Sequence, residues 1–408
     1  MSYRPTDEQF MQQALELARQ GIALASPNPH VGALLVDDQG VIIGHGTHTY
    51  DGLKHAEVLT LEEAGAEARG ATLYLTLEPC THVGRTGPCS DAIVAAGVKR
   101  VFVAMRDPNP IVHGRGVAQL RAAGIEVEEG LFQAEARKLN EAFAKYIRRK
   151  VPFVTLKTAM TLDGKIAPPP GEPPEPGMIA ASGWITSEEA RAHVHELRHA
   201  NDAIMVGVGT VIADDPLLTD RTGLPRRRPL LRVILDSRLR LPIDSRMVKT
   251  ARGDLIVFCC FAEENKRREL EKRGVIVEQV PMQRTPENRT LLFPGSAPVD
   301  GRPDLERVME SLGENDIASL IIEGGSMVNW AALSAGIVDK IFFYYAPKIL
   351  AGTGSVPFAL GAGYRHISEA ASIKSLTLHR FGEDFAVEGY LRDPYEDEIR
   401  LVPPQENS

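Results

Sequence analysis

Four residues in the first quarter of the chain combine the ligands of a zinc site with a nearby carboxylate. His55 and Glu57 stand two positions apart at the start of an expected helix, and Cys80 and Cys89 follow an expected strand. Zinc held by one histidine and two thiolates keeps a fourth position for water and lowers the pKa of that water to about 7. Glu57 is placed to take the proton and pass it to a substrate. This H-x-E, P-C and Cys pattern predicts a zinc-dependent deaminase.

Two other interpretations of these residues stay open. His82 could complete a closed four-ligand site, which would be structural rather than catalytic. The four residues could also occur together by coincidence, although Cys80 and Cys89 frame a polar loop and so do not both belong to the core of one element. The catalytic site is favoured over both alternatives.

The elements expected around these residues form an α/β domain. Thr6 and Gln9 give a capping pattern for a first helix that ends at Gly21. The apolar patterns that follow predict strands at 32–36, 41–44, 72–77, 100–104 and 125–128, and helices near 55–64, 90–96, 115–123 and 133–149. This alternation predicts a layered domain with a mainly parallel sheet. The last helix ends in a basic run before Val151-Pro152, so we place the domain boundary there, between residues 1–150 and 151–408.

A second α/β domain is expected in the rest of the chain. Its apolar patterns predict strands at 153–159, 203–207, 230–236, 254–258, 275–277, 319–322 and 340–345, and helices near 187–199, 262–273, 303–312 and 326–335. Glycines follow two of these strands, at Val206 to Thr210 and at Glu323 to Gly325. Such junctions either cradle phosphates on backbone N–H groups or are plain turns. The proline-rich run Pro168 to Pro176 is expected to be an extended surface loop.

Composition excludes several classes of protein. A length of 408 residues suggests two domains, and a net charge of −8 argues against a nucleic-acid partner, whose phosphates need clustered Lys and Arg. No stretch approaches the roughly 20 apolar residues that span a bilayer, so no membrane partner is expected. The start of the chain has no apolar signal, and only four cysteines occur, which favours a cytoplasmic location. Cys259 and Cys260 are expected to be reduced and buried.

The spacing of the cysteines departs from the usual two-residue gap. The segment from Pro79 to Cys89 resembles the long-loop pattern of the bifunctional deaminase/reductase family of riboflavin biosynthesis. Further segments across nearly the whole chain resemble the same family, namely 28–32, 46–48, 55–58, 107–110, 140–143, 156–167, 184–186, 209–216 and 323–325. The resemblance implies a cytidine-deaminase-like three-layer α/β/α domain followed by a dihydrofolate-reductase-like α/β domain. The loop Pro168 to Pro176 departs from the family and is interpreted as a tolerated surface insertion, with a role in substrate access or in contact with a neighbouring subunit as the alternatives.

The resemblance also assigns roles to individual residues. It implies one zinc ion per chain at His55, Cys80 and Cys89, with Glu57 as the proton shuttle. It places deaminase substrate contacts at Asn28, His48, His82, Arg85, Thr86, Asp107 and Asn109. In the second domain it implies NADPH contacts at Ala159, Trp184, Thr210, Asp214, Ser237 and Gly325, and substrate contacts at Ser182, Arg198, Leu218, Arg221 and Glu323. Arg198 and Arg221 suit one phosphate, whereas Trp184 could also be plain core.

The implied activity is deamination of a pyrimidine ribosyl phosphate, followed by NADPH-dependent reduction of its ribosyl group to ribityl. A homo-oligomer formed through the reductase domain is expected. One rival is a tRNA or polynucleotide deaminase with an unrelated appended domain, which the negative net charge disfavours. Another is a catalytically dead nucleotide-binding regulator, which the intact set of His55, Glu57, Cys80 and Cys89 disfavours.

Overall fold

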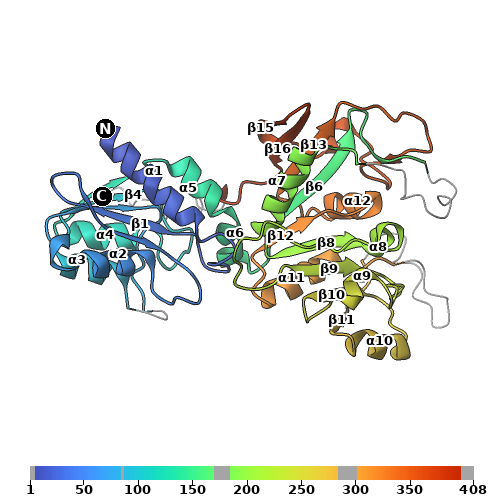
Figure 1. The fold of residues 1–408 in the computed structure, drawn as a ribbon, viewed down its shortest axis with the longest axis horizontal. Helices are drawn as coiled ribbons and strands as arrows, with labels where there is room; N and C mark the ends of the chain where they lie inside the picture. The colour runs from blue at the N-terminus through green and yellow to red at the C-terminus, as the bar shows by residue number, and fades with distance from the viewer. Residues whose placement is uncertain (1–4, 84–86, 170–183, 284–300, 397–408) are drawn as a thin grey trace, which may run out of the picture. The chain divides into compact units, whose positions relative to one another are not determined.

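The chain divides into two compact units (Figure 1). In the computed structural model, residues 5–83, 87–169, 184–283 and 301–396 are described. The first unit comprises Met1–Val151 together with Pro225–Arg228 and Pro394–Ser408, and the second comprises Pro152–Leu224 and Pro229–Asp393. Two short segments from beyond the expected boundary therefore belong to the first unit. Among the described residues, no helix combines the length and the apolar character needed to cross a bilayer.

A five-stranded sheet in the order β2-β1-β3-β4-β5 forms the middle of the first unit. Its strands are β1 (Gly32–Val36), β2 (Ile42–Thr47), β3 (Thr72–Leu75), β4 (Arg100–Val103) and β5 (Glu126–Glu129). β3, β4 and β5 are parallel, whereas β1 is antiparallel to both β2 and β3. The sheet is mixed rather than mainly parallel, because the connection between β1 and β2 is too short for a parallel crossover.

Helices cover both faces of this sheet. They are α1 (Pro5–Arg19), α2 (Ala56–Ala64), α3 (Cys89–Ala96), α4 (Arg115–Ala122), α5 (Gln133–Leu139) and α6 (Glu141–Arg149), with a 3-10 turn at Gly65–Ala68. Figure 1 shows α1 and α5 on one side of the sheet and α2, α3 and α4 on the other. The core between these layers contains fully buried Leu35, Leu73 and Phe102. The three-layer α/β/α domain expected from the sequence is therefore present.

The single helix expected over 133–149 is wrong. The chain forms two helices, α5 and α6, which are separated at the completely buried residue Asn140. The Asn140 side chain accepts a hydrogen bond from the His30 backbone N–H at 2.8 Å and donates one to the His30 carbonyl at 3.1 Å. Because these bonds require Asn140 to turn toward a segment 110 residues away, the helix breaks there. The same bonds fix the loop that carries Asn28.

The second unit is built on a nine-stranded sheet in the order β11-β10-β9-β8-β12-β6-β13-β16-β15. These strands are β6 (Phe153–Thr161), β8 (Ala203–Gly207), β9 (Leu231–Leu235), β10 (Leu255–Cys259), β11 (Val275–Gln279), β12 (Ser319–Ile322), β13 (Lys340–Ala346), β15 (Lys374–Phe381) and β16 (Asp384–Tyr390). The seven strands from β11 to β13 are parallel, and β16 is antiparallel to β13 and β15. A separate pair, β7 (Lys165–Ala167) and β14 (Val356–Pro357), is antiparallel.

The helices of this unit connect the parallel strands. They are α7 (Glu188–His199), α8 (Val208–Asp214), α9 (Arg246–Lys249), α10 (Glu264–Glu271), α11 (Leu305–Glu314) and α12 (Ser326–Ser334), with a 3-10 turn at Ile367–Glu369. Ser187 caps α7 by accepting a hydrogen bond from the Ala190 N–H, and Ala190 and Val194 join the buried cluster around Phe342 and Tyr344. α7 is thereby held against β13 and β16.

Candidate active sites

Three side chains from separate elements meet at the predicted zinc site. His55 is the N-cap of α2, Cys80 follows β3, and Cys89 is the first residue of α3. His55 Nδ1 lies 3.1 Å from Cys89 Sγ and 3.6 Å from Cys80 Sγ. A nitrogen and a sulfur ligand of one tetrahedral zinc ion are roughly 3.5 Å apart, given bonds of about 2.0 and 2.3 Å. The three donor atoms therefore fit one zinc ion.

The predicted alternative of a closed four-ligand site lacks support in the described part of the chain. The potential metal ligands that gather there are His55, Cys80 and Cys89 alone, and His82 is exposed. Three protein ligands leave a position for the reacting molecule, which is the arrangement of catalytic zinc. The donor set thus favours catalysis over a structural role.

Close backbone contacts bring the ligands together. A Cβ atom added to Gly46 on β2 would lie 2.3 Å from the Ala56 carbonyl oxygen, so only glycine lets the start of α2 approach the strand this closely. Cys80 Sγ accepts a hydrogen bond from the Cys89 backbone N–H at 3.4 Å, which joins the segment after β3 to the start of α3. His55 and both cysteines are thereby held by the fold itself.

The electrostatics of the site suit metal binding and proton transfer. The hydrogen bond from the Cys89 thiol, aided by His55, lowers the pKa of Cys80, which favours a thiolate ligand at this position. Glu57 lies in α2 and is only 4 % exposed. Burial raises the pKa of Glu57, while the nearby His55 opposes that rise. A carboxyl with a raised pKa can exchange protons near neutral pH, as a proton shuttle must.

Asn28 and His48 form a hydrogen-bonded pair beside the metal ligands. His48 Nδ1 is 3.0 Å from the Lys54 carbonyl oxygen, which can only accept, so Nδ1 carries the proton. In the neutral ring His48 Nε2 is then an acceptor, and Asn28 Nδ2 donates to it at 3.0 Å. This assignment fixes the orientation of the Asn28 amide, so that its Oδ1 can accept a hydrogen bond from a substrate. The His48 and His55 rings are in edge contact, with centroids 5.2 Å apart.

Asp107 lies in the loop after β4 and is 7 % exposed. Burial, helped by repulsion from Glu78, Cys80 and Glu57, raises the pKa of Asp107 to about 7, although the Asn109 backbone N–H donates to its carboxylate at 2.8 Å. Electrostatic interaction with both Cys80 and Glu57 places Asp107 at the same site. The Asn109 side chain instead accepts from the Ile111 backbone N–H at 3.2 Å and so shapes the loop.

The structure gathers most of the residues predicted for the deaminase site. His55, Glu57, Cys80, Cys89, Asn28, His48 and Asp107 lie together, with Asn109 adjoining Asp107. His82 is exposed on the loop between the cysteines. Arg85 and Thr86 lie outside the described residues.

A buried charge cluster marks the second unit. Arg198 on α7 donates to both carboxylate oxygens of Glu323, at 2.6 and 2.9 Å, and Lys157 on β6 lies 3.4 Å from the same carboxylate. Burial would raise the pKa of Glu323, but the two cations outweigh burial and lower the pKa to about 2. Sequence reasoning missed Lys157, whose signal is the only charged residue of the largely buried strand β6.

The loop that carries Arg221 is anchored to α7. Arg198 Nη1 donates to the Thr219 carbonyl at 3.2 Å, and His199 Nδ1 lies 2.7 Å from Asp220 Oδ2. His195, one turn before His199, has a buried Nδ1 without a hydrogen-bond partner among the described residues, and its pKa is lowered by burial and then by Arg198 and Arg221. His195 was also missed, although its helical spacing from Arg198 could have indicated it. Nearby Leu218 is buried, and Ser182 lies outside the described residues.

Three predicted NADPH residues follow the carboxyl ends of neighbouring parallel strands. Ser237 follows β9, Thr210 follows β8, and Gly325 follows β12 and caps α12. A Cβ atom added to Gly325 would lie 3.4 Å from Thr210 Oγ1, so the two glycine-rich turns are close neighbours. The N-terminus of a helix such as α12 is suited to the phosphates of a dinucleotide, and ligands bind at this edge of open α/β sheets.

The other predicted NADPH residues lie on β6, at the end of α8 and before α7. Ala159 lies on β6, and Asp214 ends α8, where burial raises its pKa. Trp184 is 74 % exposed, and the Arg191 guanidinium lies 4.8 Å from its ring centroid. The alternative that Trp184 is plain core is therefore wrong.

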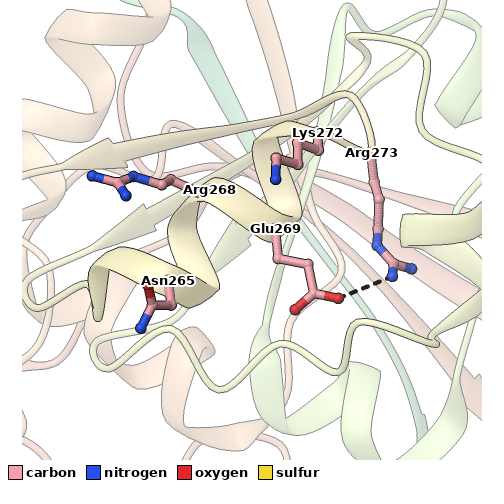
Figure 2. Close-up of a pocket in the computed structure, with 5 residues that line it drawn as sticks. All are labelled: Asn265, Arg268, Glu269, Lys272 and Arg273. Atoms are coloured by element: carbon pink, nitrogen blue, oxygen red, sulfur yellow. Dashed lines mark hydrogen bonds and ion pairs between the residues drawn. The ribbon is translucent and has the colours of Figure 1, made fainter.

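A pocket on α10 lies apart from these residues. Its lining residues, Asn265, Arg268, Glu269, Lys272 and Arg273, all come from α10 and the turn after it (Figure 2). Arg273 pairs with Glu269 at 3.0 Å, and such exposed pairs one helical turn apart are typical of a solvated helix surface. This pocket has none of the buried groups that mark the two candidate sites.

Comparisons with known proteins match both parts of the chain. The cytidine and deoxycytidylate deaminase zinc-binding region matches residues 4–105, and the RibD C-terminal domain matches residues 152–387. The riboflavin biosynthesis protein RibD of Actinobacillus pleuropneumoniae is 40 % identical over 95 % of this chain and 96 % of its own length. The corresponding protein of Escherichia coli is 38 % identical over 93 % and 97 %.

Solved structures give the same result. RibD of Acinetobacter baumannii superposes with a TM-score of 0.76 at 35 % identity and covers 94 % of this chain and 98 % of its own. A deaminase/reductase from Thermotoga maritima has a TM-score of 0.73 at 37 % identity with the same coverage. The chain therefore belongs to the RibD family of riboflavin biosynthesis proteins.

Proposed function

We propose that this protein deaminates diaminohydroxyphosphoribosylaminopyrimidine and then reduces 5-amino-6-(5-phosphoribosylamino)uracil, the two activities named for the Thermotoga maritima relative. The observation that carries the first activity is the three-ligand cluster beside the buried carboxyl of Glu57. The second activity is supported by the glycine turns after β8 and β12, which suit NADPH. It is also supported by Arg198 and Arg221, whose positive charges both act on His195.

In the deaminase site each side chain has a separate task. Zinc held by His55, Cys80 and Cys89 supplies an activated water molecule when it is bound. Glu57 would accept one proton of that water and pass it to the ring nitrogen, and would then carry the remaining hydroxyl proton to the amine, which leaves as ammonia. Asn28 Oδ1 and the carboxyl of Asp107 hold the polar edge of the pyrimidine, since both can form directed hydrogen bonds with amino and amide groups. His48 orients Asn28 through their hydrogen bond.

Residues predicted around this pyrimidine complete the site by the family resemblance. Arg85 and Thr86 bind the phosphate, with Asn109 and His82 at the rim. Because the substrate is a small phosphate ester, the protein needs no basic surface, in keeping with a net charge of −8. The same charge argues against the polynucleotide-deaminase alternative.

In the reductase site the protein mainly binds and orients. NADPH, held by Ala159, Trp184, Thr210, Asp214, Ser237 and Gly325, supplies the hydride. Arg221 binds the substrate phosphate from an exposed loop, with Ser182 and Leu218 beside the substrate. Arg198 and Lys157 keep Glu323 ionised. Its carboxylate can then accept hydrogen bonds from the sugar hydroxyls.

One experiment tests both activities. Purified protein is incubated with the diaminopyrimidine ribosyl phosphate, and ammonia release and NADPH oxidation are recorded separately. Ammonia should appear without NADPH, and NADPH oxidation should require either prior deamination or added deaminated intermediate. Absence of ammonia from zinc-loaded protein would overturn the deaminase assignment, and absence of NADPH oxidation with the intermediate would overturn the reductase assignment.

Arg221→Met should weaken reductase binding of the phosphorylated intermediate by about tenfold to a hundredfold, because a hydrogen bond to a charged group contributes roughly 1.5 to 3 kcal/mol. The wild-type protein should bind a dephosphorylated intermediate poorly, and Arg221→Met should weaken that binding little further. A second variant, Arg198→Met, should lower the melting temperature of the protein, because buried Glu323 would keep Lys157 but lose the paired guanidinium. Arg268→Met on α10 is the matched control. Equal losses of Arg221→Met with both substrates would remove Arg221 from the phosphate site.

A second copy of the chain is the proposed partner, bound through the reductase unit. β15 is an edge strand, and its Leu376 and Leu378 are 62 % and 71 % exposed, an apolar edge that monomers avoid. Light scattering should therefore give a dimer or larger species for wild type and a smaller one for Leu378→Lys. Val41→Lys, at an exposed position of the deaminase unit, should change nothing. An unchanged mass for Leu378→Lys contradicts this interface.

The four cysteines Cys80, Cys89, Cys259 and Cys260 form no disulfide, which supports a cytoplasmic location.

A further inference from the structure

Glu78 is a buried carboxylate between β3 and the zinc ligand Cys80 that no step of the proposed chemistry uses. It is 2 % exposed. Its Oε2 accepts hydrogen bonds from the backbone N–H groups of Asp107 at 3.1 Å and Gly114 at 2.9 Å, and its Oε1 accepts one from Val117 at 3.1 Å. Both oxygens thus accept backbone hydrogen bonds, and Glu78 is not among the described residues that gather as potential metal ligands.

The three donors lie at the two ends of the loop that carries Asp107. The first belongs to Asp107 itself, at the start of the loop after β4. Gly114 is the N-cap of α4 and Val117 lies in its first turn, and the N-cap residue supplies no side-chain hydrogen bond. Glu78 therefore replaces the missing cap, and its negative charge suits the N-terminus of α4. One side chain closes the loop from Asp107 to Gly114.

The packing of α4 reinforces this arrangement. A Cβ atom added to Gly116 would lie 2.1 Å from the Pro79 carbonyl oxygen, so α4 contacts the backbone of the residue between Glu78 and Cys80. The Glu78 backbone N–H also donates to the Met105 carbonyl at 3.0 Å. The metal-binding segment and the Asp107 loop are thus joined through Glu78 at several points.

We propose that Glu78 is a positioning residue that holds the Asp107 loop in register with the metal ligands. This role rests on the proposed deaminase function, in which Asp107 contacts the pyrimidine. Through the three N–H groups, Glu78 sets the place of the Asp107 carboxyl relative to Cys80. Its loss would loosen the substrate contact without removing a zinc ligand.

Glu78→Gln keeps the shape of the side chain but turns an NH₂ group toward backbone donors, so part of the hydrogen bonding is lost. The deaminase KM for the pyrimidine phosphate should rise about tenfold to a hundredfold. The zinc content, the reductase kcat and the reductase KM should match wild type. Glu78→Asp keeps the charge with a shorter reach and should give a smaller rise in KM. Glu63→Gln, at an exposed residue of α2 that pairs with His45, is the control and should leave the deaminase KM unchanged.

Amide hydrogen exchange gives a readout that does not depend on activity. In Glu78→Gln, or in Glu78→Asp if the first variant does not fold, the amides of Asp107, Gly114 and Val117 should exchange faster than in wild type, whereas those of β6 should not. Wild-type KM and wild-type exchange in these variants would overturn the proposal, as would loss of zinc or a parallel decline of both activities. If wild-type protein releases no ammonia, the proposed function fails, while the exchange measurement still decides whether Glu78 holds the loop.

Discussion

Glu57→Gln should lower ammonia release by about a hundredfold to ten-thousandfold, the usual contribution of a positioned acid–base group. NADPH oxidation should stay at the wild-type rate when the deaminated intermediate is supplied. Glu57 is buried beside His55 on α2, and glutamine fills the same space but cannot accept the proton. The variant should fold, because burial already raises the pKa of this carboxyl and a neutral side chain avoids that cost. Steady-state assays of the two products measure both effects.

Glu62→Gln is the matched control for this substitution. Glu62 lies on the same helix but is exposed and pairs with Lys54 at 2.7 Å, so its loss should alter neither activity. If Glu57→Gln lowered both activities in a folded protein with normal zinc content, the two sites would not be separable. Ammonia release at the wild-type rate would remove Glu57 from the proton transfer.

Cys80→Ser should reduce the zinc content from about one ion per chain to a small fraction and abolish ammonia release. Zinc binds the thiolate form of cysteine, which the lowered pKa of Cys80 favours, whereas a serine hydroxyl stays protonated. Metal analysis by mass spectrometry and the ammonia assay measure the two losses. The reductase activity should persist, since the predicted NADPH residues lie in the second unit.

Cys260→Ser provides the comparison for Cys80→Ser. Burial raises the pKa of the Cys260 thiol to about 11, so it is not a thiolate, and it lies outside the group of metal ligands. The control should retain zinc and both activities. Full ammonia release by wild-type protein stripped of zinc would contradict the metal assignment.

The chemistry of the deaminase site was predictable because it depends on the types of the ligand residues and on their order along the sequence. His55 and Glu57 need only a helix start, and Cys80 and Cys89 need only a strand and the next helix, all of which the local pattern predicts. The contacts that orient these residues were not predictable in this way. The Glu78 carboxylate binds amides 29 to 39 residues away, and Asn140 binds the backbone of His30 across 110 residues.

Each feature that the sequence did not predict has its own physical cause. β15 is an edge strand with most of its side chains exposed, so its sequence lacks the apolar run used to recognise strands. The break between α5 and α6 was hidden because the helical pattern on both sides of Asn140 is continuous, and only a tertiary hydrogen bond interrupts it. Arg198 was predicted at a phosphate, and its pairing with the carboxylate of Glu323 was not predicted, because no local signal connects the two residues.

The two short returns of the chain to the first unit bear on how such a gene can be divided. Tyr395, near the end of the described chain, is buried in the first unit, where its hydroxyl donates to the Arg137 carbonyl at 2.8 Å. Arg227 donates to the Ser26 carbonyl at 2.8 Å and lies 3.5 Å above the Tyr50 ring. A gene fragment that stops at codon 150 therefore encodes a deaminase without pieces of its own surface and core. Gene fission would first have to replace these contacts, so this architecture favours inheritance of both activities as one reading frame.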